Sequence, residues 1–299
     1  MYDVPQAERY TVRNDYAFKK VFGSEANKDI LIEFVSLVTG MDKAAFAEVQ
    51  LENTELAAQF YDEKTGRLDI KIRLRSGEKI DIEMQNIWFD HFTKRSIFYW
   101  TELLTEHFKK GEDYCELHKC IAINILNQPF ELSKKIHATY KILETDEHIL
   151  LDDLFEIHFL DLTKIPVENR NALEKWLAFI QTDDEEVRRM LARENPLMEK
   201  AQSVMEEFYT TPEQRALYQA ALRYESDRVS MINESLRKGH AAGKQEGIQL
   251  GKQEGIQLGK QEGLAEGVRK TAAALKKMGL PMDQIMQATS LTKEEVELL

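Results

Sequence analysis

The sequence predicts an α/β fold with a mixed central sheet flanked by helices, followed by a C-terminal helical region. Two observations lead to this expectation. From residue 14 to about residue 166, segments with helical spacing of apolar residues alternate with segments whose apolar residues recur at every second position. Beyond about residue 168 the strand patterns cease and helical patterns continue.

The first two expected elements are helices. In "NDYAFKKVFG", Asn14 is a suitable N-cap and Gly23 can end the helix. Apolar residues then recur at helical spacing between residues 24 and 40, which predicts a second, more deeply buried helix beneath the sheet. These residues are Ile30, Leu31, Phe34, Leu37 and Val38.

A β-hairpin is expected next, in "RLDIKIRLRSGEKIDIEMQN". Its apolar residues alternate with charged ones, and Arg75, Ser76 and Gly77 form the turn. Two registers keep the apolar residues on one face. In the first, paired residue numbers sum to 152 and Asp69 lies opposite Glu83; in the second they sum to 154 and Lys71 lies opposite Glu83.

Three further elements complete the expected sheet domain. "FDHFTKRSIFYWTELLTEHFKKG" predicts a long helix closed by Gly111, and "HKCIAINIL" has the continuous apolar character of a strand buried on both faces. "IHFLDL", residues 157–162, predicts another strand.

The C-terminal part contains an internal repeat. "GKQEGIQL" occurs at 243–250 and 251–258, a degraded copy follows at 259–266, and glycine recurs every four residues from Gly239 to Gly267. Eight helical glycines cost about 8 kcal/mol relative to alanine, which favours a flexible linker. The intervening residues tolerate helix and proline is absent, so we favour a self-associating helix that forms a homo-oligomer. Three short helices are expected in the tail, broken at Gly279 and at "TSLT".

These patterns divide the chain into four parts: a core at 10–166, a helical extension at 167–235, the repeat at 236–267 and a small helical tail at 268–299.

Composition and charge limit the classes of function that the protein can have. The chain has 299 residues, of which 43% are hydrophobic, and its net charge of −12 argues against wrapping nucleic acid over the whole surface. Two cysteines without a metal-binding pattern, and no long apolar segment, favour a cytoplasmic protein without a membrane span.

The polar face of the hairpin has the composition of a metal site. Either register leaves the carboxylates of Asp69 and Glu83 within about 5–8 Å, close enough for one cation to bridge. Two carboxylates suit Mg²⁺ or Mn²⁺ acting on a phosphate. Gln85 lies on the same face and can orient a water, while Lys71 and Arg73 can supply positive charge.

Asp69 followed by Glu83-x-Gln85 resembles the PD-(D/E)XK nuclease core in its E-x-Q form. The wider set of "NDYAFKKVFG", "RSIFYW" and "KGEDYCELHKCIAINIL" is similar to the bacterial recombination-promoting nucleases, also called PD-(D/E)XK family transposases. The Gly-rich repeat is a looser match. The resemblance implies a restriction-endonuclease-like core and a Mg²⁺-dependent endonuclease acting on DNA, with Gln85 in place of the lysine common in the superfamily.

The resemblance also implies further site residues. An acidic residue on the first helix often completes the site, which points to Asp15, although Asp15 is equally a favourable first-turn residue. Arg95 and Tyr99, one helical turn apart, are expected substrate contacts beside Lys71 and Arg73.

Two hypotheses for the function follow. The first is a metal-dependent DNA endonuclease serving recombination, mobile elements or defence. The alternative is a catalytically silent interaction protein that keeps the fold and binds partners through its repeat.

Overall fold

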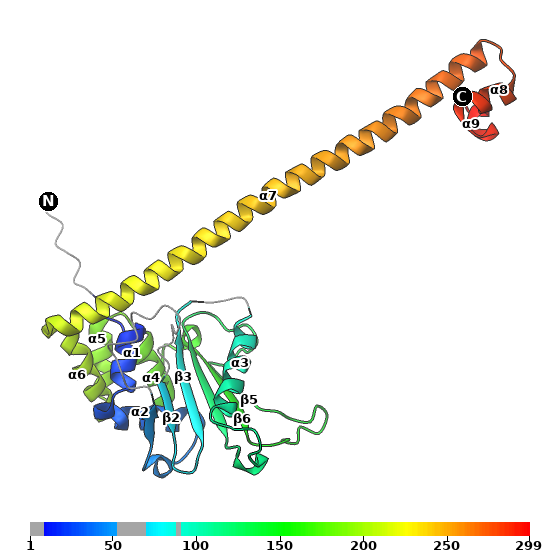
Figure 1. The fold of residues 1–299 in the computed structure, drawn as a ribbon. Coiled ribbons are helices and arrows are strands. Elements are labelled where there is room, and N and C mark those ends of the chain that lie inside the picture. The colour runs from blue at the N-terminus through cyan, green and yellow to red at the C-terminus, as the bar shows by residue number, and fades with distance from the viewer. Residues whose placement is uncertain (1–8, 53–69, 88–90) are drawn as a thin grey trace, which may run out of the picture. The chain divides into compact units, whose positions relative to one another are not determined.

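The computed structural model describes residues 9–52, 70–87 and 91–299. Its centre is a mixed sheet with the strand order β1-β2-β3-β4-β6-β5 (Figure 1). Strands β1 to β3 are antiparallel, β3, β4 and β6 are parallel, and β5 is antiparallel to β6. The bounds are β1 Gln50–Glu52, β2 Ile70–Arg73, β3 Lys79–Gln85, β4 Cys120–Leu126, β5 His137–Tyr140 and β6 Phe155–Asp161. The predicted mixed sheet is therefore confirmed.

Helices cover both faces of this sheet (Figure 1). On one face lie α1, Asp15–Phe22, and α2, Lys28–Thr39, whose apolar side chains join Ile80, Ile82 and Ile123 in the main core. On the other face α3, Phe92–Thr105, buries Phe92 and Trp100 against alternate residues of β4 and β6 in a second core. β4 is buried on both faces because it lies between these two cores, as its sequence predicts.

The caps of the first two helices act as expected. Asn14 Oδ1 accepts hydrogen bonds from the amides of Tyr16 and Ala17, at 3.1 and 3.2 Å, and Gly23 ends α1. α2 ends at Gly40, whose φ of 72° is the left-handed conformation typical of a helix C-terminus.

The hairpin adopts the first of the two predicted registers. Ile70 pairs with Ile82 and Lys71 pairs with Asp81, so the residue numbers sum to 152. Lys71 therefore lies opposite Asp81 rather than Glu83. The expected turn is present, and Gly77 is required there because its φ is +101° and a Cβ atom would lie 2.5 Å from the His118 ring.

Three sequence expectations differ from the structure. α3 ends at Thr105 instead of continuing to Gly111, because the Lys79 ammonium donates to the carbonyls of Leu103 and Glu106 at 3.0 and 2.7 Å and occupies the helix end. Strands β1 and β5 were not predicted, since short edge strands show little apolar alternation. β6 begins two residues earlier than expected, and Leu162 belongs to a 3₁₀ turn.

The helical extension packs on α1 and α2. Its helices are α4, Ala172–Gln181, α5, Glu185–Ala192, α6, Pro196–Thr210, and the start of α7, Pro212–Lys277. Trp176 and Phe208 lie in the main core, and Tyr218 of α7 stacks edge-on against Tyr10 with ring centroids 4.8 Å apart. The extension is thus part of the same compact unit as the sheet, residues 1–227.

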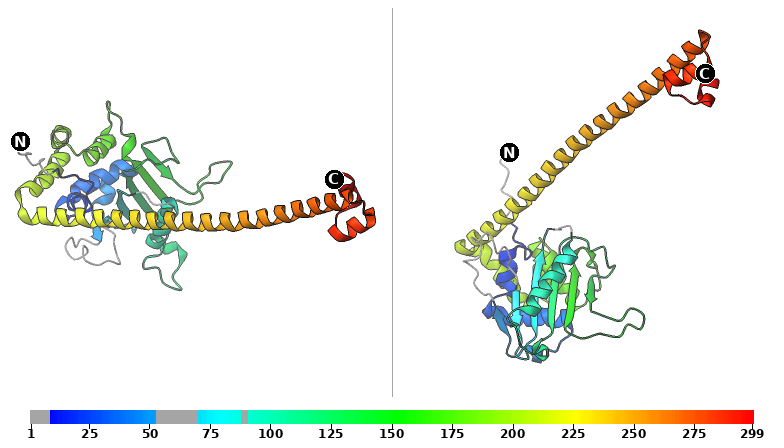
Figure 2. Two further views of the ribbon diagram at one scale, coloured as in Figure 1. Left: turned by 90° about the horizontal axis from the view of Figure 1, so that it is seen from above. Right: turned by 45° about the vertical axis from the view of Figure 1, so that its right-hand side comes forward.

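Residues 228–299 form a second unit, in which the glycine repeat lies inside α7. α7 is an unbroken helix in both further views (Figure 2). The tail has two short helices, α8, Met282–Thr289, and α9, Lys293–Glu297, instead of the expected three. The first of the expected three is the end of α7, which stops at Lys277, two residues before Gly279. Thr292 and Glu295 form the expected capping box, and Ala272, Ile285 and Val296 form a small core. Among the described helices, none is long and apolar enough to cross a membrane.

Candidate active site

Glu83 lies on the polar face of β3, on the side of the sheet that α3 covers. Alternation along β3 sends Ile80, Ile82 and Met84 into the main core. Asp81 and Glu83 therefore point to the opposite side, where the Glu83 side chain remains 15% exposed. Asp69, the predicted second metal ligand, lies outside the described residues.

Arg95 of α3 contacts the Glu83 carboxylate. Its Nη2 atom lies 3.1 Å from Glu83 Oε1, and its guanidinium lies over the Tyr99 ring, 5.2 Å from the ring centroid. The helical spacing of Arg95 and Tyr99 produces this arrangement, because residues four apart share one face of a helix. The structure thus brings together three of the residues that the sequence singled out.

Gln85 is 6% exposed and anchored locally. Its Nε2 atom donates to the Ile87 carbonyl, and its backbone carbonyl accepts from the backbone amide of Asn127 at 3.0 Å. These bonds fix the ends of β3 and β4 beside one another. The side-chain amide of Gln85 is consequently held by the turn that follows β3.

Lys71 and Arg73 share the face of Glu83, but each interacts with another carboxylate. Lys71 Nζ lies 3.9 Å from Glu106 Oε1, and Arg73 Nε lies 2.6 Å from Glu52 Oε1 across the β1–β2 edge. Both basic side chains therefore lie on β2 beside β3, and the carboxylates they pair with are Glu106 and Glu52 rather than Glu83.

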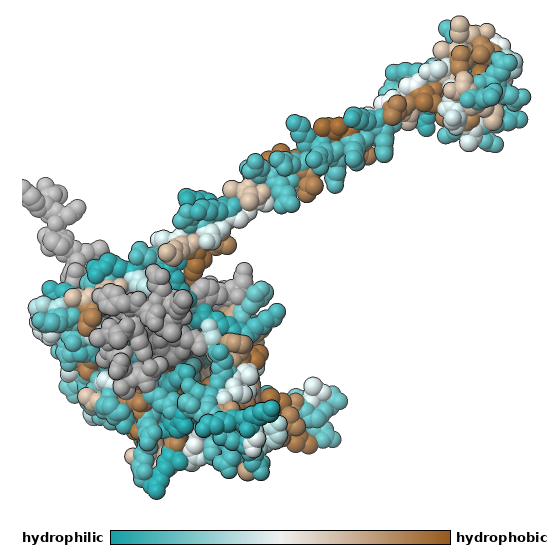
Figure 3. All heavy atoms as spheres, in the orientation of Figure 1, coloured by the Kyte–Doolittle hydropathy of each residue, from teal (hydrophilic) through white to brown (hydrophobic). Residues whose placement is uncertain are grey.

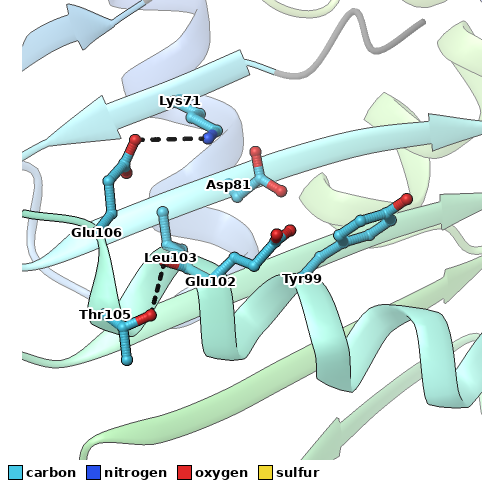
Figure 4. Close-up of a pocket in the computed structure, with 7 residues that line it drawn as sticks. All are labelled: Lys71, Asp81, Tyr99, Glu102, Leu103, Thr105 and Glu106. Atoms are coloured by element: carbon cyan, nitrogen blue, oxygen red, sulfur yellow. Dashed lines mark hydrogen bonds and ion pairs between the residues drawn. The ribbon is translucent and has the colours of Figure 1, made fainter. Parts of the chain in front are cut away.

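A polar pocket of about 400 Å³ adjoins this site (Figure 4). Lys71 and Asp81 line it from the sheet, and Tyr99 and Glu102 line it from α3. Leu103, Thr105 and Glu106 complete the lining. Among the described residues that line the pocket, three carboxylates accompany one lysine, a balance that favours cations over phosphate. The alternation along β3 predicts that Asp81 lies on this polar face. The positions of Glu102 and Glu106 could not be predicted, because they depend on how α3 packs against the sheet.

The start of α1 lies at the carboxyl ends of β3 and β4. Asn86 Nδ2 donates to the Arg13 carbonyl at 2.7 Å, and Arg13 Nη1 donates to Asn127 Oδ1 at 2.9 Å. Asp15 follows in the first turn of α1 and is half-buried. No sequence pattern points to Arg13, Asn86 or Asn127, because these residues lie far apart in the chain and form no local motif.

In the part of the chain that the structure describes, no three His, Cys, Asp or Glu side chains gather in a group able to hold a metal ion. Of the two predicted metal ligands, Glu83 is the one that can be placed, and it is a partly exposed carboxylate beside an acidic pocket. This oxygen donor and the negative surroundings fit a hard divalent cation.

The fold and the candidate site together define a class of protein. A mixed sheet flanked by helices, with a carboxylate near the end of a hairpin strand, is the α/β fold of the PD-(D/E)XK nucleases. The chain belongs to the PD-(D/E)XK nuclease family transposases, because the model of that family matches residues 12–235. The match covers the sheet and the helical extension and stops before the repeat. No curated protein and no solved structure gives a significant match.

Proposed function

We propose that this protein is a divalent-metal-dependent DNA endonuclease that hydrolyses phosphodiester bonds. The main support is the Glu83 carboxylate on the polar face of β3, in a chain whose family is one of nucleases. Recombination, movement of mobile elements and defence are the processes that such an activity would serve.

Glu83 and Asp69 are the residues that we propose to hold Mg²⁺ or Mn²⁺. Such an ion, when bound, supplies positive charge to the phosphate and lowers the pKa of a bound water. Gln85 uses its amide nitrogen on Ile87, which leaves its carbonyl oxygen to accept a hydrogen bond from the attacking water. We propose Asp15 as an additional acidic group, because α1 begins beside the ends of β3 and β4.

Arg95 is the proposed contact to the phosphate nearest Glu83. With no DNA bound, its guanidinium neutralises the Glu83 carboxylate. When a cation binds that carboxylate, the guanidinium can pair with a phosphate oxygen while Tyr99 supports its planar face. Lys71 and Arg73 add positive charge nearby, and the carboxylates of Glu106 and Glu52 partly neutralise it.

The repeat is proposed to assemble the protein into a homo-oligomer. Around the repeat glycines there is open space where a Cβ atom would lie, and Ile248, Leu250, Ile256 and Leu258 are exposed. Apolar patches interrupt the hydrophilic surface of α7 (Figure 3). Identical chains present identical helix surfaces, and two active sites brought together would allow both strands of a duplex to be cut.

Plasmid cleavage by the purified protein in Mg²⁺ or Mn²⁺ tests the proposed activity. Glu83→Gln keeps the size of the side chain and removes its charge, so we expect cleavage to fall by at least about 100-fold and metal affinity to weaken. Glu78→Gln, in the turn of the same hairpin, is the matched control and should cut normally. A wild-type chain that is folded and never cuts supports the silent interaction protein; a Glu83→Gln chain that cuts normally excludes the proposed site.

A further inference from the structure

Arg13 is held in a fixed orientation at the carboxyl ends of β3 and β4. Its Nε atom donates to Thr11 Oγ1 at 3.3 Å and its Nη1 atom donates to Asn127 Oδ1 at 2.9 Å. The Arg13 carbonyl accepts from Asn86 Nδ2 at 2.7 Å, which ties the backbone to the end of β3. Two neutral oxygens and one backbone anchor therefore orient the guanidinium before any ligand arrives.

The third nitrogen of this guanidinium, Nη2, pairs with Asp183 in the loop between α4 and α5. The Asp183 side chain is 53% exposed, whereas the Arg13 side chain is 17% exposed. An ion pair with so exposed a carboxylate contributes little to stability, so another anion can replace Asp183 at low cost. A phosphate oxygen would fit the same position, since arginine binds carboxylates and phosphates with the same planar group of donors.

The position of Arg13 relative to the candidate site suits a contact to the DNA backbone. The backbone amide of Asn127 donates to the backbone carbonyl of Gln85, while the side chain of Asn127 accepts from the Arg13 guanidinium. Asn127 thus links Arg13 to the end of the strand that carries Glu83. Glu83 and Asn86 are three positions apart in the chain, about 10 Å at 3.3 Å per residue. Phosphates along one DNA strand rise by about 3.4 Å each, so this distance spans only a few nucleotides.

We propose that Arg13 binds a DNA phosphate within a few nucleotides of the one that is cleaved, and that Asp183 pairs with its guanidinium in the absence of DNA. This inference rests on the proposed nuclease function and adds a substrate contact to it. Because Asp183 belongs to the helical extension, the inference also gives that region a role in controlling access to the site.

Two variants with opposite expected effects test the proposal. The assay is equilibrium binding of a labelled duplex, measured by fluorescence anisotropy over a range of salt concentrations in Ca²⁺ without turnover. Arg13→Gln should weaken binding about tenfold and reduce the slope of log K against log salt by about one. Asp183→Asn should tighten binding about two- to threefold, because it removes the competing carboxylate.

Arg75→Gln is the matched control. Arg75 also pairs with an exposed carboxylate, Glu48, but lies at the opposite end of the hairpin strands, and its loss should leave binding within about twofold of wild type. If Arg13 merely braces the fold, Arg13→Gln and Asp183→Asn break the same ion pair and should weaken binding together. Weaker binding in Asp183→Asn therefore overturns the proposal.

The remaining outcomes are also decisive. A wild-type protein that neither binds nor cuts DNA rejects the proposed function, whereas a wild type that binds while Arg13→Gln behaves like Arg75→Gln rejects this inference alone. Should Arg13→Gln fail to fold by circular dichroism, Arg13→Lys and Asp183→Asn carry the test. Arg13→Lys should keep the wild-type salt slope because it keeps the charge, and a reduced slope would contradict the proposal.

Discussion

At the scale of single residues, Glu83 and Arg95 form an ion pair in the candidate site. The two side chains are 15% and 26% exposed, so water still screens the pair and its contribution to stability is modest. Its importance is therefore chemical. The same guanidinium can neutralise a carboxylate in the free protein and a phosphate in a complex with DNA.

Replacing Arg95 should consequently affect DNA more than folding. We expect Arg95→Met to lower kcat/KM for DNA cleavage by at least about tenfold, while the free energy of unfolding changes by less than about 1 kcal/mol. Arg95→Lys should be intermediate, since it keeps the charge and loses the planar contact with Tyr99. Lys94→Met, an exposed neighbour on α3, is the control; equal losses in both methionine variants would remove Arg95 from the site.

A second group of titratable residues lies on β5 and β6, at the edge of the sheet opposite β1. His137 Nε2 is 2.8 Å from His158 Nδ1, and His158 Nε2 is 2.7 Å from Glu156 Oε1. Burial, together with the neighbouring His158, lowers the pKa of His137 to about 4 from its ordinary value of 6.5. The Glu156 pKa is also lowered, because hydrogen bonds from His158, Lys119 and Lys141 outweigh the opposing effect of its burial.

This shift predicts how stability depends on pH. The unfolded chain takes up a proton on His137 near pH 6.5 and the folded chain only near pH 4, so the stabilisation is complete above 6.5 and is lost as pH falls towards 4. His137→Gln should flatten the curve of unfolding free energy between pH 6.5 and 4.5, measured by urea denaturation. His240→Gln, exposed on α7, should retain the wild-type curve; parallel curves for wild type and His137→Gln would refute the assignment.

At the scale of elements, the end of α3 depends on a residue of β3. The carbonyls of Leu103 and Glu106 accept hydrogen bonds from the Lys79 ammonium, which also places positive charge at the negative end of the helix. Since α3 carries Arg95 and Tyr99, this contact links the helix that bears the expected substrate residues to the strand that bears Glu83.

Lys79→Met should therefore destabilise the sheet domain. We expect a loss of about 1–3 kcal/mol in the free energy of unfolding, because two carbonyls lose a charged donor while the aliphatic part of the side chain is kept. Urea denaturation followed by circular dichroism measures this loss. Lys110→Met removes an exposed lysine just beyond α3 and should cost under about 0.5 kcal/mol. Equal stability of the two variants would show that Lys79 does not hold the helix end.

The register of the hairpin is also a property of elements. Either predicted register buries the same apolar residues, so their alternation leaves the choice open. In the observed register the paired residue numbers sum to 152. The outer edges of the hairpin are paired as well, β2 with β1 and β3 with β4. The resulting pairs put Lys71 beside Asp81, and thereby form one wall of the acidic pocket.

At the scale of the whole molecule, the chain divides into two compact units, and the boundary between residues 227 and 228 falls within the sequence of α7. Tyr218 and Ala221, in the first turns of α7, belong to the core of the first unit. The repeat and the tail belong to the second unit, whose small core contains Ala272, Ile285 and Val296. Folding of the first unit should therefore not require the second.

A chain truncated after Ser235 tests the proposed assembly. It keeps Tyr218 and Ala221, so we expect the melting temperature of the first unit to stay within about 3 °C of its value in the full chain. Its mass by light scattering should fall to that of a monomer, and its ratio of nicked to linear plasmid product should rise. An unchanged mass distribution and product ratio would mean that the repeat does not assemble the protein.

Local structure is the part of this protein that can be predicted from the sequence alone. Asn14 caps α1 through atoms two and three residues away, and alternation along β3 assigns Glu83 to the polar face in either register. The capping box at Thr292 likewise depends only on residues close in sequence. Such features are predictable because the interacting groups lie within one element or one turn.

Contacts between residues far apart in the sequence depend instead on the packing of the whole domain. Arg13 and Asn127 are 114 positions apart, and Lys79 ends α3 from 24 and 27 positions away. Neither contact leaves a periodic signal in the sequence, because each depends on how β3, β4 and the helices pack. The contacts of Arg13 and Lys79 therefore require the tertiary structure, whereas the position of Glu83 on the polar face of β3 can be predicted from the alternation along its strand.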